Sequence, residues 1–217
     1  MINNKFFVTG WNHSGTTIIQ HEIANQLGIN TEKRLEESLP NLNESSKCIW
    51  KYPGETKQRA YKYLKKLLLD SKQPIHVIIV IRDPNDLISS ILKRSLKSKK
   101  TEEKKISNLF NEYIFFLKFL TEEFIKIYKN YTVIKLEEFV YNSEFFLKNL
   151  NLNNYKIEKN EVNISERPSD TNHKELRIWQ SNQCINKNII QHSNIKYNES
   201  IEIEKYHNKL LHEYSKK

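Results

Sequence analysis

Residues 5–27 read KFFVTGWNHSGTTIIQHEIANQL and determine the architecture that we expect for this 217-residue chain. The stretch opens with Phe6–Val8, an apolar run that is too short for a helix and rich in strand formers. A loop bounded by Gly10 and Gly15 follows, and the apolar spacing beyond it predicts an amphipathic helix that Gly28 can end. A strand, a glycine-bounded loop and a helix in this order can hold a phosphate with backbone N–H groups.

The loop departs at one position from the nucleotide-triphosphatase pattern G-x-x-x-x-G-K-[ST]. Thr16 stands where that pattern has the lysine that reaches the β- and γ-phosphates. The substitution argues against ATP or GTP chemistry but keeps the phosphate cradle, to which Ser14, Thr16 and Thr17 add hydroxyl groups. An ordinary turn with a chance pair of glycines is the alternative, so a second signal is needed.

A second motif begins with residues 76–81, HVIIVI, which predict a parallel strand buried on both faces. The strand runs into Arg82 and a proline two residues later, which suits the first turn of a helix. Ser90 follows Arg82 by eight residues and Arg94 follows Ser90 by four, which predicts a second anion site, separate from the first. The alternative is a buried strand with an ordinary surface helix. Two such sites suit a nucleotide phosphorylated at its 5′ and 3′ positions.

Both motifs resemble those of sulfotransferases that use 3′-phosphoadenosine 5′-phosphosulfate (PAPS). FVTGWNHSGTT resembles the 5′-phosphosulfate loop, which usually ends in [RK]-S-G-T-T, and VIIVIRDPNDLISSILKR resembles the 3′-phosphate motif. The resemblance is closest to the tyrosylprotein and carbohydrate branches. It implies a single domain over residues 1–217 with an α/β three-layer sandwich around a central parallel sheet, a P-loop-NTPase-like sulfotransferase fold. It also implies sulfuryl transfer to a hydroxyl or amine of a carbohydrate or small-molecule acceptor, with no metal required.

The resemblance implies cofactor contacts from both motifs and from one later segment. In tyrosylprotein sulfotransferases a serine and a lysine before an L-x-x-W helix close over the nucleotide, and Ser169 and Lys174 match that order. The implied PAPS contacts are His13, Ser14, Gly15, Thr16, Thr17, Arg82, Ser90, Arg94, Ser169 and Lys174.

Two residues are candidates for catalysis, and two more for a general base. Lys51 lies in a W-K-x-P ending that resembles the K-x-P element of the family, where it would stabilise charge on the leaving phosphate oxygen; the alternative is a surface lysine. His13 replaces the usual Lys or Arg, and a neighbouring phosphate favours its protonated form, so we predict a leaving-group donor aided by Lys51. The alternative is that His13 only caps the loop and that the protein binds PAPS weakly or not at all. Glu36 or Glu37 could take the acceptor proton, although a solvated turn explains them as well.

The rest of the chain supplies the remaining layers of the predicted sandwich. We expect a short strand at 47–51, an amphipathic helix at 55–71, a long aromatic helix at 106–128 whose aromatic side chains form core, a strand at 131–136 and a tail helix at 199–214 that packs across the sheet. Glu137, at the end of the last strand, is expected to be structural.

Composition narrows the class of partner. The net charge is +9 and the isoelectric point is about 9.3, which favours acidic ligands, but the charge is scattered rather than gathered in a nucleic-acid-binding arm. Cys48 and Cys184 lack metal-ligand spacing and suit free thiols in a reducing compartment. With neither a signal segment nor a membrane-length apolar run in the sequence, we expect a cytoplasmic protein whose oligomeric state the sequence leaves open.

Two other functions stay open. One is a P-loop-like nucleotide kinase or hydrolase, which the Thr16 substitution disfavours. The other is a non-catalytic nucleotide- or nucleic-acid-binding protein that keeps the fold. Saccharides, lipid headgroups, peptide tyrosines and small metabolites all remain possible acceptors.

Overall fold

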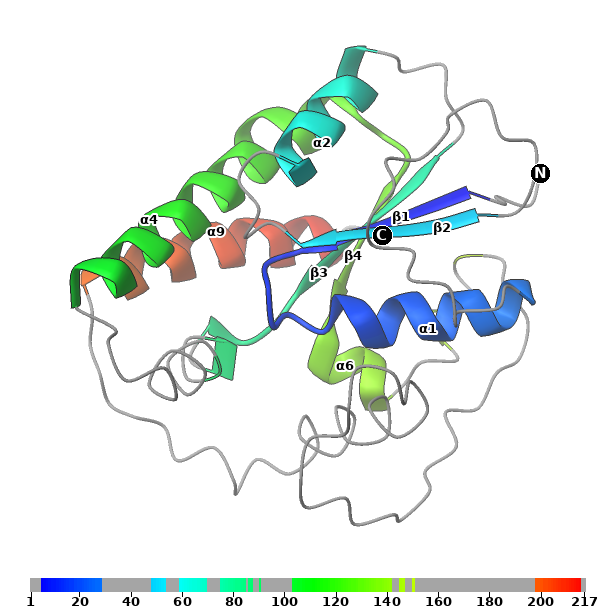
Figure 1. Ribbon diagram of the computed structural model, residues 1–217, viewed down its shortest axis with the longest axis horizontal. Helices are drawn as coiled ribbons and strands as arrows, with labels where there is room; N and C mark the ends of the chain where they lie inside the picture. The colour runs from blue at the N-terminus through cyan, green and yellow to red at the C-terminus, as the bar shows by residue number, and fades with distance from the viewer. Residues whose placement is uncertain are drawn as a thin grey trace.

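The computed structural model describes residues 5–28, 48–53, 59–69, 75–84, 86–87, 90, 103–141, 145–146, 150 and 198–215. Its centre is a sheet of four parallel strands in the order β2-β1-β3-β4 (Figure 1). The strands are β1 (Lys5–Gly10), β2 (Cys48–Pro53), β3 (His76–Ile81) and β4 (Tyr131–Lys135). The predicted α/β class with a central parallel sheet is therefore confirmed.

The register aligns the carboxyl ends of the strands at one edge of the sheet. Gly10, the last residue of β1, pairs with Pro53 of β2 on one side and with Val80 of β3 on the other. Because β1 lies between these two strands, the loop that follows it has neighbouring strand ends on both sides. In open parallel sheets this edge is where ligands bind.

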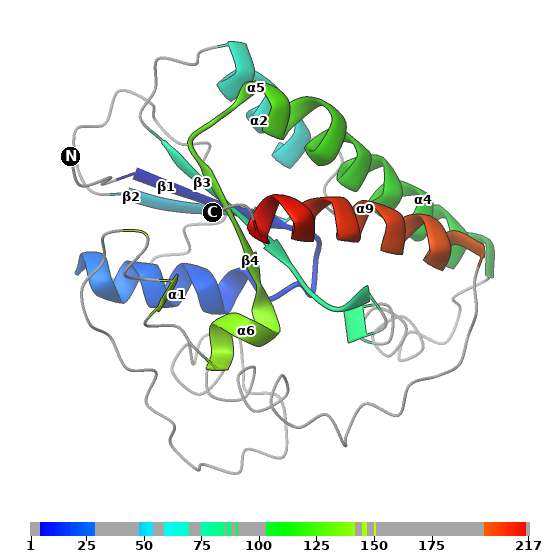
Figure 2. The same ribbon diagram turned by 180° about the vertical axis from the view of Figure 1, so that it is seen from behind.

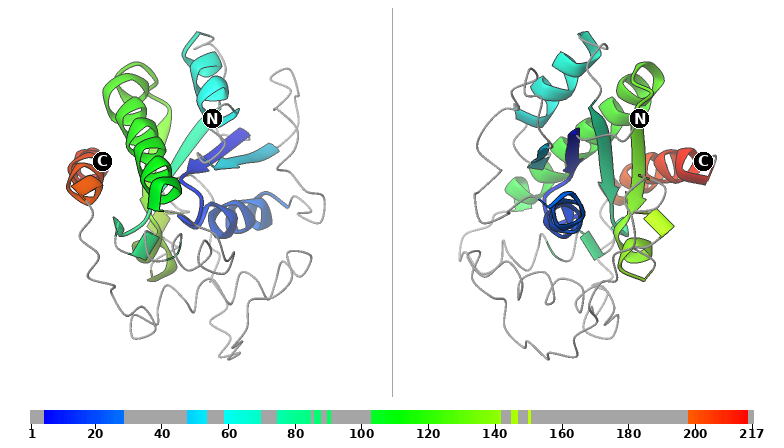
Figure 3. Two further views of the ribbon diagram at one scale, coloured as in Figure 1. Left: turned by 60° about the vertical axis from the view of Figure 1, so that its left-hand side comes forward. Right: turned by 90° about the vertical axis from the view of Figure 1, so that its right-hand side faces the viewer.

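Side chains alternate between two separate apolar clusters, one on each face of the sheet. In β1, Phe6 and Val8 pack with α1 (Thr16–Leu27) and α6 (Leu136–Tyr141), whereas Phe7 packs with the opposite cluster. The second cluster joins α2 (Arg59–Leu69), α4 (Glu103–Phe119) and α9 (Asn198–Ser215). Figures 1 and 3 show these two groups of helices on opposite sides of the strands. Helices therefore flank the sheet on both faces.

The long aromatic helix predicted at 106–128 is present, with one π-helical turn inside it. It consists of α4, the π-helix η1 (Leu120–Phe124) and the short α5 (Ile125–Ile127). Most of its aromatic residues are buried as expected, but Phe115 is 50% exposed. The prediction of a core position was wrong there, because Phe115 lies on the outer side of α4 against Tyr61 of α2, with ring centroids 5.5 Å apart.

The remaining predicted elements are present with shifted ends. The strand expected at 47–51 runs to Pro53, the helix expected at 55–71 spans 59–69, and the helix expected at 199–214 spans 198–215. Gly28 follows α1 with a φ of 68°, as a helix-ending glycine does. Helix α9 lies beside β4 and packs along α4 (Figure 2). Among the helices in the described part of the chain, none has the length and apolarity needed to cross a bilayer.

Candidate anion site at the carboxyl end of β1

The loop between β1 and α1 is held in one conformation by close contacts. Gly15 has a φ of 90°, and a Cβ there would lie 2.5 Å from the side chain of Leu136. A Cβ on Gly10 would lie 2.4 Å from the carbonyl oxygen of Val80. His13 also has a positive φ, 69°, which is uncommon for a residue with a side chain. Packing therefore requires glycine at both positions.

Polar donors surround the start of α1. The helix begins at Thr16, directly after the loop, and has no acidic residue in its first turn. The positive end of the helix dipole is therefore not neutralised by a carboxylate of the helix itself. Ser14 is 1% exposed, and its Oγ has no hydrogen-bond partner within the described ranges. A buried hydroxyl without a partner is costly, which is typical of a group that a ligand satisfies.

Lys51 reaches the same helix from β2. Its side chain is 4% exposed, and its Nζ donates a hydrogen bond of 2.7 Å to Oγ1 of Thr17. The register pairs Lys51 with Val8, which brings the lysine to the α1 face of the sheet. Thr17 holds the position whose hydroxyl binds Mg²⁺ in nucleotide-triphosphatase loops. Here that hydroxyl instead accepts a hydrogen bond from the ammonium group of Lys51.

The second motif contacts the loop directly. Nη1 of Arg82 donates a 3.1 Å hydrogen bond to the carbonyl oxygen of His13, and Oγ of Ser90 lies 3.2 Å from Nδ1 of the same histidine. Nε of Arg82 is buried without a partner among the described residues. The sequence predicted a second anion site separate from the first. In the structure, Arg82 and Ser90 both contact His13 of the loop, so the two motifs lie side by side.

Glu137 and Asp83 connect the ends of β3 and β4. The backbone N–H of Asp83 donates a 3.0 Å hydrogen bond to Oε1 of Glu137, and Oδ1 of Asp83 accepts one of 3.2 Å from the N–H of Asp86. Burial raises the pKa of Glu137, opposed by its backbone hydrogen bonds and by Arg82. Glu137 thus holds the residue after Arg82 in place, in keeping with the structural role expected of it.

Behind the loop lies a buried aromatic pair that sequence reasoning missed. Trp11 packs against Tyr113 of α4, with ring centroids 5.0 Å apart, and the Tyr113 hydroxyl contacts Nε2 of His207 of α9. Burial lowers the pKa of His207 to about 4, assisted by Lys135 and opposed by Asp83, and burial also raises the pKa of Tyr113. Both groups are neutral near pH 7. A histidine on an amphipathic helix gives no sequence signal for this contact with Tyr113.

The predicted residues now divide into two groups. One cluster contains the residues of both motifs that the structure describes together with the strand lysine: His13, Ser14, Gly15, Thr16, Thr17, Lys51, Arg82 and Ser90. The other predicted residues lie outside the described part of the chain: Arg94, Glu36, Glu37, Ser169 and Lys174.

The cluster combines several features that bind anions. Lys51 of β2 contacts the first turn of α1, Arg82 at the end of β3 contacts the carbonyl of His13, and α1 begins directly after the same loop. Such an arrangement suits a ligand with more than one phosphate-like group. Compared with known proteins, the chain matches no family model and no curated protein.

Proposed function

We propose that the protein is a sulfotransferase that moves the sulfuryl group of PAPS to a hydroxyl or amine of a carbohydrate or small-molecule acceptor. The observation that carries this proposal is the 2.7 Å hydrogen bond from Lys51 to Thr17. In a nucleotide triphosphatase that hydroxyl is a ligand of Mg²⁺. In this protein the ammonium group of Lys51 contacts the Thr17 hydroxyl. This contact supports a site in which protein cations balance the charge of the ligand.

The donors of the loop fit the 5′-phosphosulfate end of PAPS. The N–H groups at the start of α1 and the buried hydroxyl of Ser14 can hold its non-reacting oxygens. When bound, PAPS supplies the activated sulfuryl group and leaves as the 3′,5′-bisphosphate. Lys51 stabilises the charge that develops on the leaving phosphate oxygen, and His13, when protonated, donates a hydrogen bond to it.

The second half of the cluster fits a 3′-phosphate. A guanidinium group has five N–H donors in a planar fork, and one of those of Arg82 is used on the His13 carbonyl while Nε has no described partner. Ser90 adds a hydroxyl beside it. A phosphate at this place distinguishes a 3′,5′-bisphosphate nucleotide from ATP.

One observation favours a second candidate, a nucleotide-binding protein without transferase activity. The carbonyl of His13 accepts from Arg82 and its ring contacts Ser90, so both parts of the residue already have structural partners. In that case His13 caps the loop and does not act as a leaving-group donor.

Calorimetric titration with 3′-phosphoadenosine 5′-phosphate (PAP), beside ATP with and without Mg²⁺, tests the proposal. We expect metal-independent binding of PAP that Arg82→Gln weakens at least about tenfold, because a charge-assisted phosphate contact is lost. Lys62→Gln removes an exposed charge from α2 and is the matched control, with unchanged affinity. Preference for Mg²⁺-ATP over PAP would overturn the proposal.

Turnover of PAPS by the wild type and by a His13→Ala variant separates the two candidates, because a nucleotide-binding protein without transferase activity transfers no sulfuryl group in either form. The transferase proposal predicts that this variant still binds PAP but transfers sulfuryl groups at least about tenfold more slowly, since a hydrogen bond to the leaving oxygen is lost. Full turnover without the imidazole would remove His13 from the mechanism and leave Lys51 as the candidate donor.

A further inference from the structure

Two buried polar atoms beyond the ends of β3 and β4 have no hydrogen-bond partner within the described ranges: Nε of Arg82 and Oε2 of Glu137. The first is a donor, and the second is an acceptor when the carboxyl group is ionised. The register pairs Ile81 with Lys135, the last residues of the two strands, so Arg82 and Glu137 follow at neighbouring strand ends. Burial of such atoms is costly unless a bound molecule contacts them.

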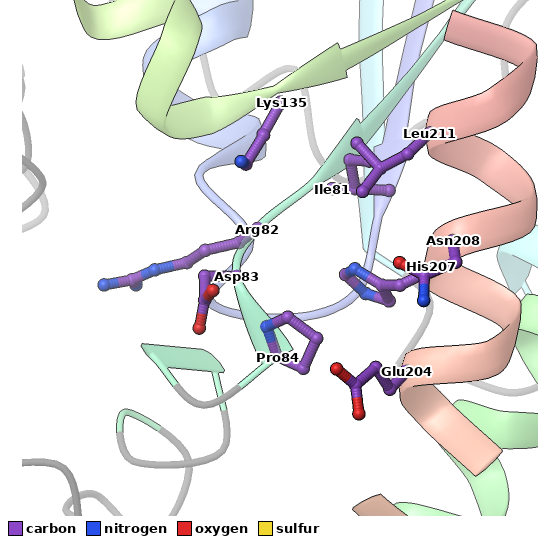
Figure 4. A pocket seen from close by; sticks show the side chains of 9 residues that line it. All are labelled: Ile81, Arg82, Asp83, Pro84, Lys135, Glu204, His207, Asn208 and Leu211. Atoms are coloured by element: carbon purple, nitrogen blue, oxygen red, sulfur yellow. The ribbon is translucent and has the colours of Figure 1, made fainter. Parts of the chain in front are cut away.

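The other polar atoms of both side chains have partners that hold them in place. Nη1 of Arg82 donates to the carbonyl oxygen of His13, and Figure 4 shows the guanidinium pointing away from α9. Oε1 of Glu137 accepts a 3.0 Å hydrogen bond from the backbone N–H of Asp83. Burial raises the pKa of Glu137, and the charge of Arg82 is one of the influences that oppose this rise, so the two side chains interact. The protein itself therefore positions Nε and Oε2.

Glu137 lies at the same edge of the sheet as the anion-binding loop. The residue before it, Leu136, packs so closely on the loop that a Cβ on Gly15 would lie 2.5 Å from its side chain. A carboxyl group at this place does not suit a site for phosphate alone. A fully ionised phosphate has no proton to donate to a carboxylate, and the two negative charges repel each other.

A hydroxyl group next to the phosphate removes this conflict. A hydroxyl donates one hydrogen bond, which a carboxylate oxygen accepts, and its own oxygen can accept from a guanidinium N–H. In a nucleoside 3′-phosphate, the 2′-hydroxyl is on the neighbouring ribose carbon. A nucleotide whose 3′-phosphate contacts Arg82 and Ser90 therefore brings a hydroxyl to the end of the sheet where Glu137 lies. Carboxylates recognise the ribose 2′-hydroxyl in the same way in dinucleotide-binding folds.

We propose that Oε2 of Glu137 accepts a hydrogen bond from the ribose 2′-hydroxyl of the bound nucleotide, so that Glu137 selects ribonucleoside 3′,5′-bisphosphates. The assignment rests on the proposed function, because a 3′-phosphate at Arg82 is what brings the 2′-hydroxyl to this place. It disfavours two close relatives of PAP. A 2′-deoxyribose has no hydroxyl for the carboxylate, and a 2′-phosphate places a second anion against it.

Calorimetric titration of the full chain with PAP, 2′-deoxyadenosine 3′,5′-bisphosphate and adenosine 2′,5′-bisphosphate tests the assignment. We expect the wild type to bind the deoxy analogue about tenfold more weakly than PAP, because a hydrogen bond to a charged group is lost. The 2′,5′ isomer should bind at least about tenfold more weakly than PAP, because its phosphate meets the carboxylate.

Glu137→Gln separates this role from the structural one. The amide oxygen can still accept from the N–H of Asp83, while an NH2 group replaces Oε2 and the charge is lost. The loss of affinity caused by the deoxy change should therefore shrink about fivefold, because a neutral hydrogen bond replaces a charged one, and the 2′,5′ isomer should gain on PAP. Glu138→Gln is the matched control and should keep both preferences, since Glu138 is 45% exposed and lies 3.9 Å from Lys135.

Each preference is a ratio of affinities measured on one protein, so a less stable variant does not mimic the effect. Equal affinity of the wild type for PAP and its 2′-deoxy analogue overturns the inference while the transferase proposal stands, and this measurement needs no variant. Preferences that Glu137→Gln leaves unchanged overturn it as well. A wild type that binds none of the three bisphosphates overturns the proposed function and this inference together.

Discussion

Acidification provides a direct test of the burial of His207 against Tyr113. The folded protein holds the pKa of His207 at about 4, against an ordinary value of 6.5, chiefly because burial penalises the charged ring. As the pH falls below 6.5, the unfolded chain takes up a proton at this residue and the folded protein does not. The free energy of unfolding therefore decreases between pH 6.5 and about 4, and His207 adds no further loss at lower pH.

The size of the effect follows from the two pKa values. Each unit of difference is worth about 1.4 kcal/mol, so the full shift corresponds to about 3 kcal/mol, of which about 2.5 kcal/mol is lost by about pH 4.5. That is a large part of the roughly 5–15 kcal/mol that stabilises a typical domain. Other histidines and carboxylates also titrate in this range, so the contribution of His207 has to be measured as a difference between variants.

Urea unfolding at a series of pH values, followed by tryptophan fluorescence, measures it. Trp11 packs against Tyr113 and reports on this region. The His207→Gln variant should lose about 2–3 kcal/mol less stability than the wild type between about pH 7 and pH 4.5. Asn208→Gln, at an exposed position of the same helix whose side chain does not titrate, is the control and should follow the wild-type slope. Parallel curves for the wild type and His207→Gln would refute the reasoning.

Three further predictions concern the loop and its supports. Lys51→Met should weaken the binding of PAP at least about tenfold in calorimetry, because a charge-assisted contact is lost. The urea midpoint should stay unchanged or rise, because an apolar side chain replaces a buried charge. A lower midpoint with intact PAP affinity would make the lysine purely structural. Gly15→Ala should lower the free energy of unfolding by about 1–3 kcal/mol in thermal unfolding, because the new Cβ meets Leu136 and the residue has a positive φ. Gly28→Ala is the control: a Cβ there has nothing within 4 Å, so only the backbone cost of about 1 kcal/mol is expected. Burial raises the pKa of Glu137 above the ordinary carboxyl value, so the wild type loses stability as the pH rises from the ordinary pKa through the raised one, and Glu137→Gln should not. Equal slopes of stability against pH for the two proteins, on the alkaline side of the ordinary carboxyl pKa, would contradict this.

Local patterns were sufficient to predict the elements around the site. The apolar run, the glycine pair and the helical spacing of residues 5–27 depend on neighbours in the chain, and β1, the loop and α1 are present as expected. The same holds for β3 and the position of Arg82 at its end. Short-range sterics and hydrophobic periodicity determine such features, so one sequence contains the necessary information.

The contacts between elements could not be predicted in the same way. The approach of Arg82 and Ser90 to His13 depends on β1 lying beside β3, and strand order is a property of the whole sheet. The outward position of Phe115 and the burial of His207 depend on where α2 and α9 pack against α4. Hydrophobic spacing cannot distinguish these arrangements, because an aromatic side chain can lie at the edge of a helical face as well as at its centre.

The central place of β1 has a consequence for how the protein folds. Its partners are distant in the chain: Val8 pairs with Lys51 and with Ile78, so both sides of the anion site are closed by contacts of long sequence separation. Such contacts require large loops to close first and slow the search for the native topology. Nascent chains that end before β3 lack Arg82 and Ser90. The proposed nucleotide affinity therefore arises late in folding, and a ligand that binds the finished cluster selectively stabilises molecules whose sheet is already complete.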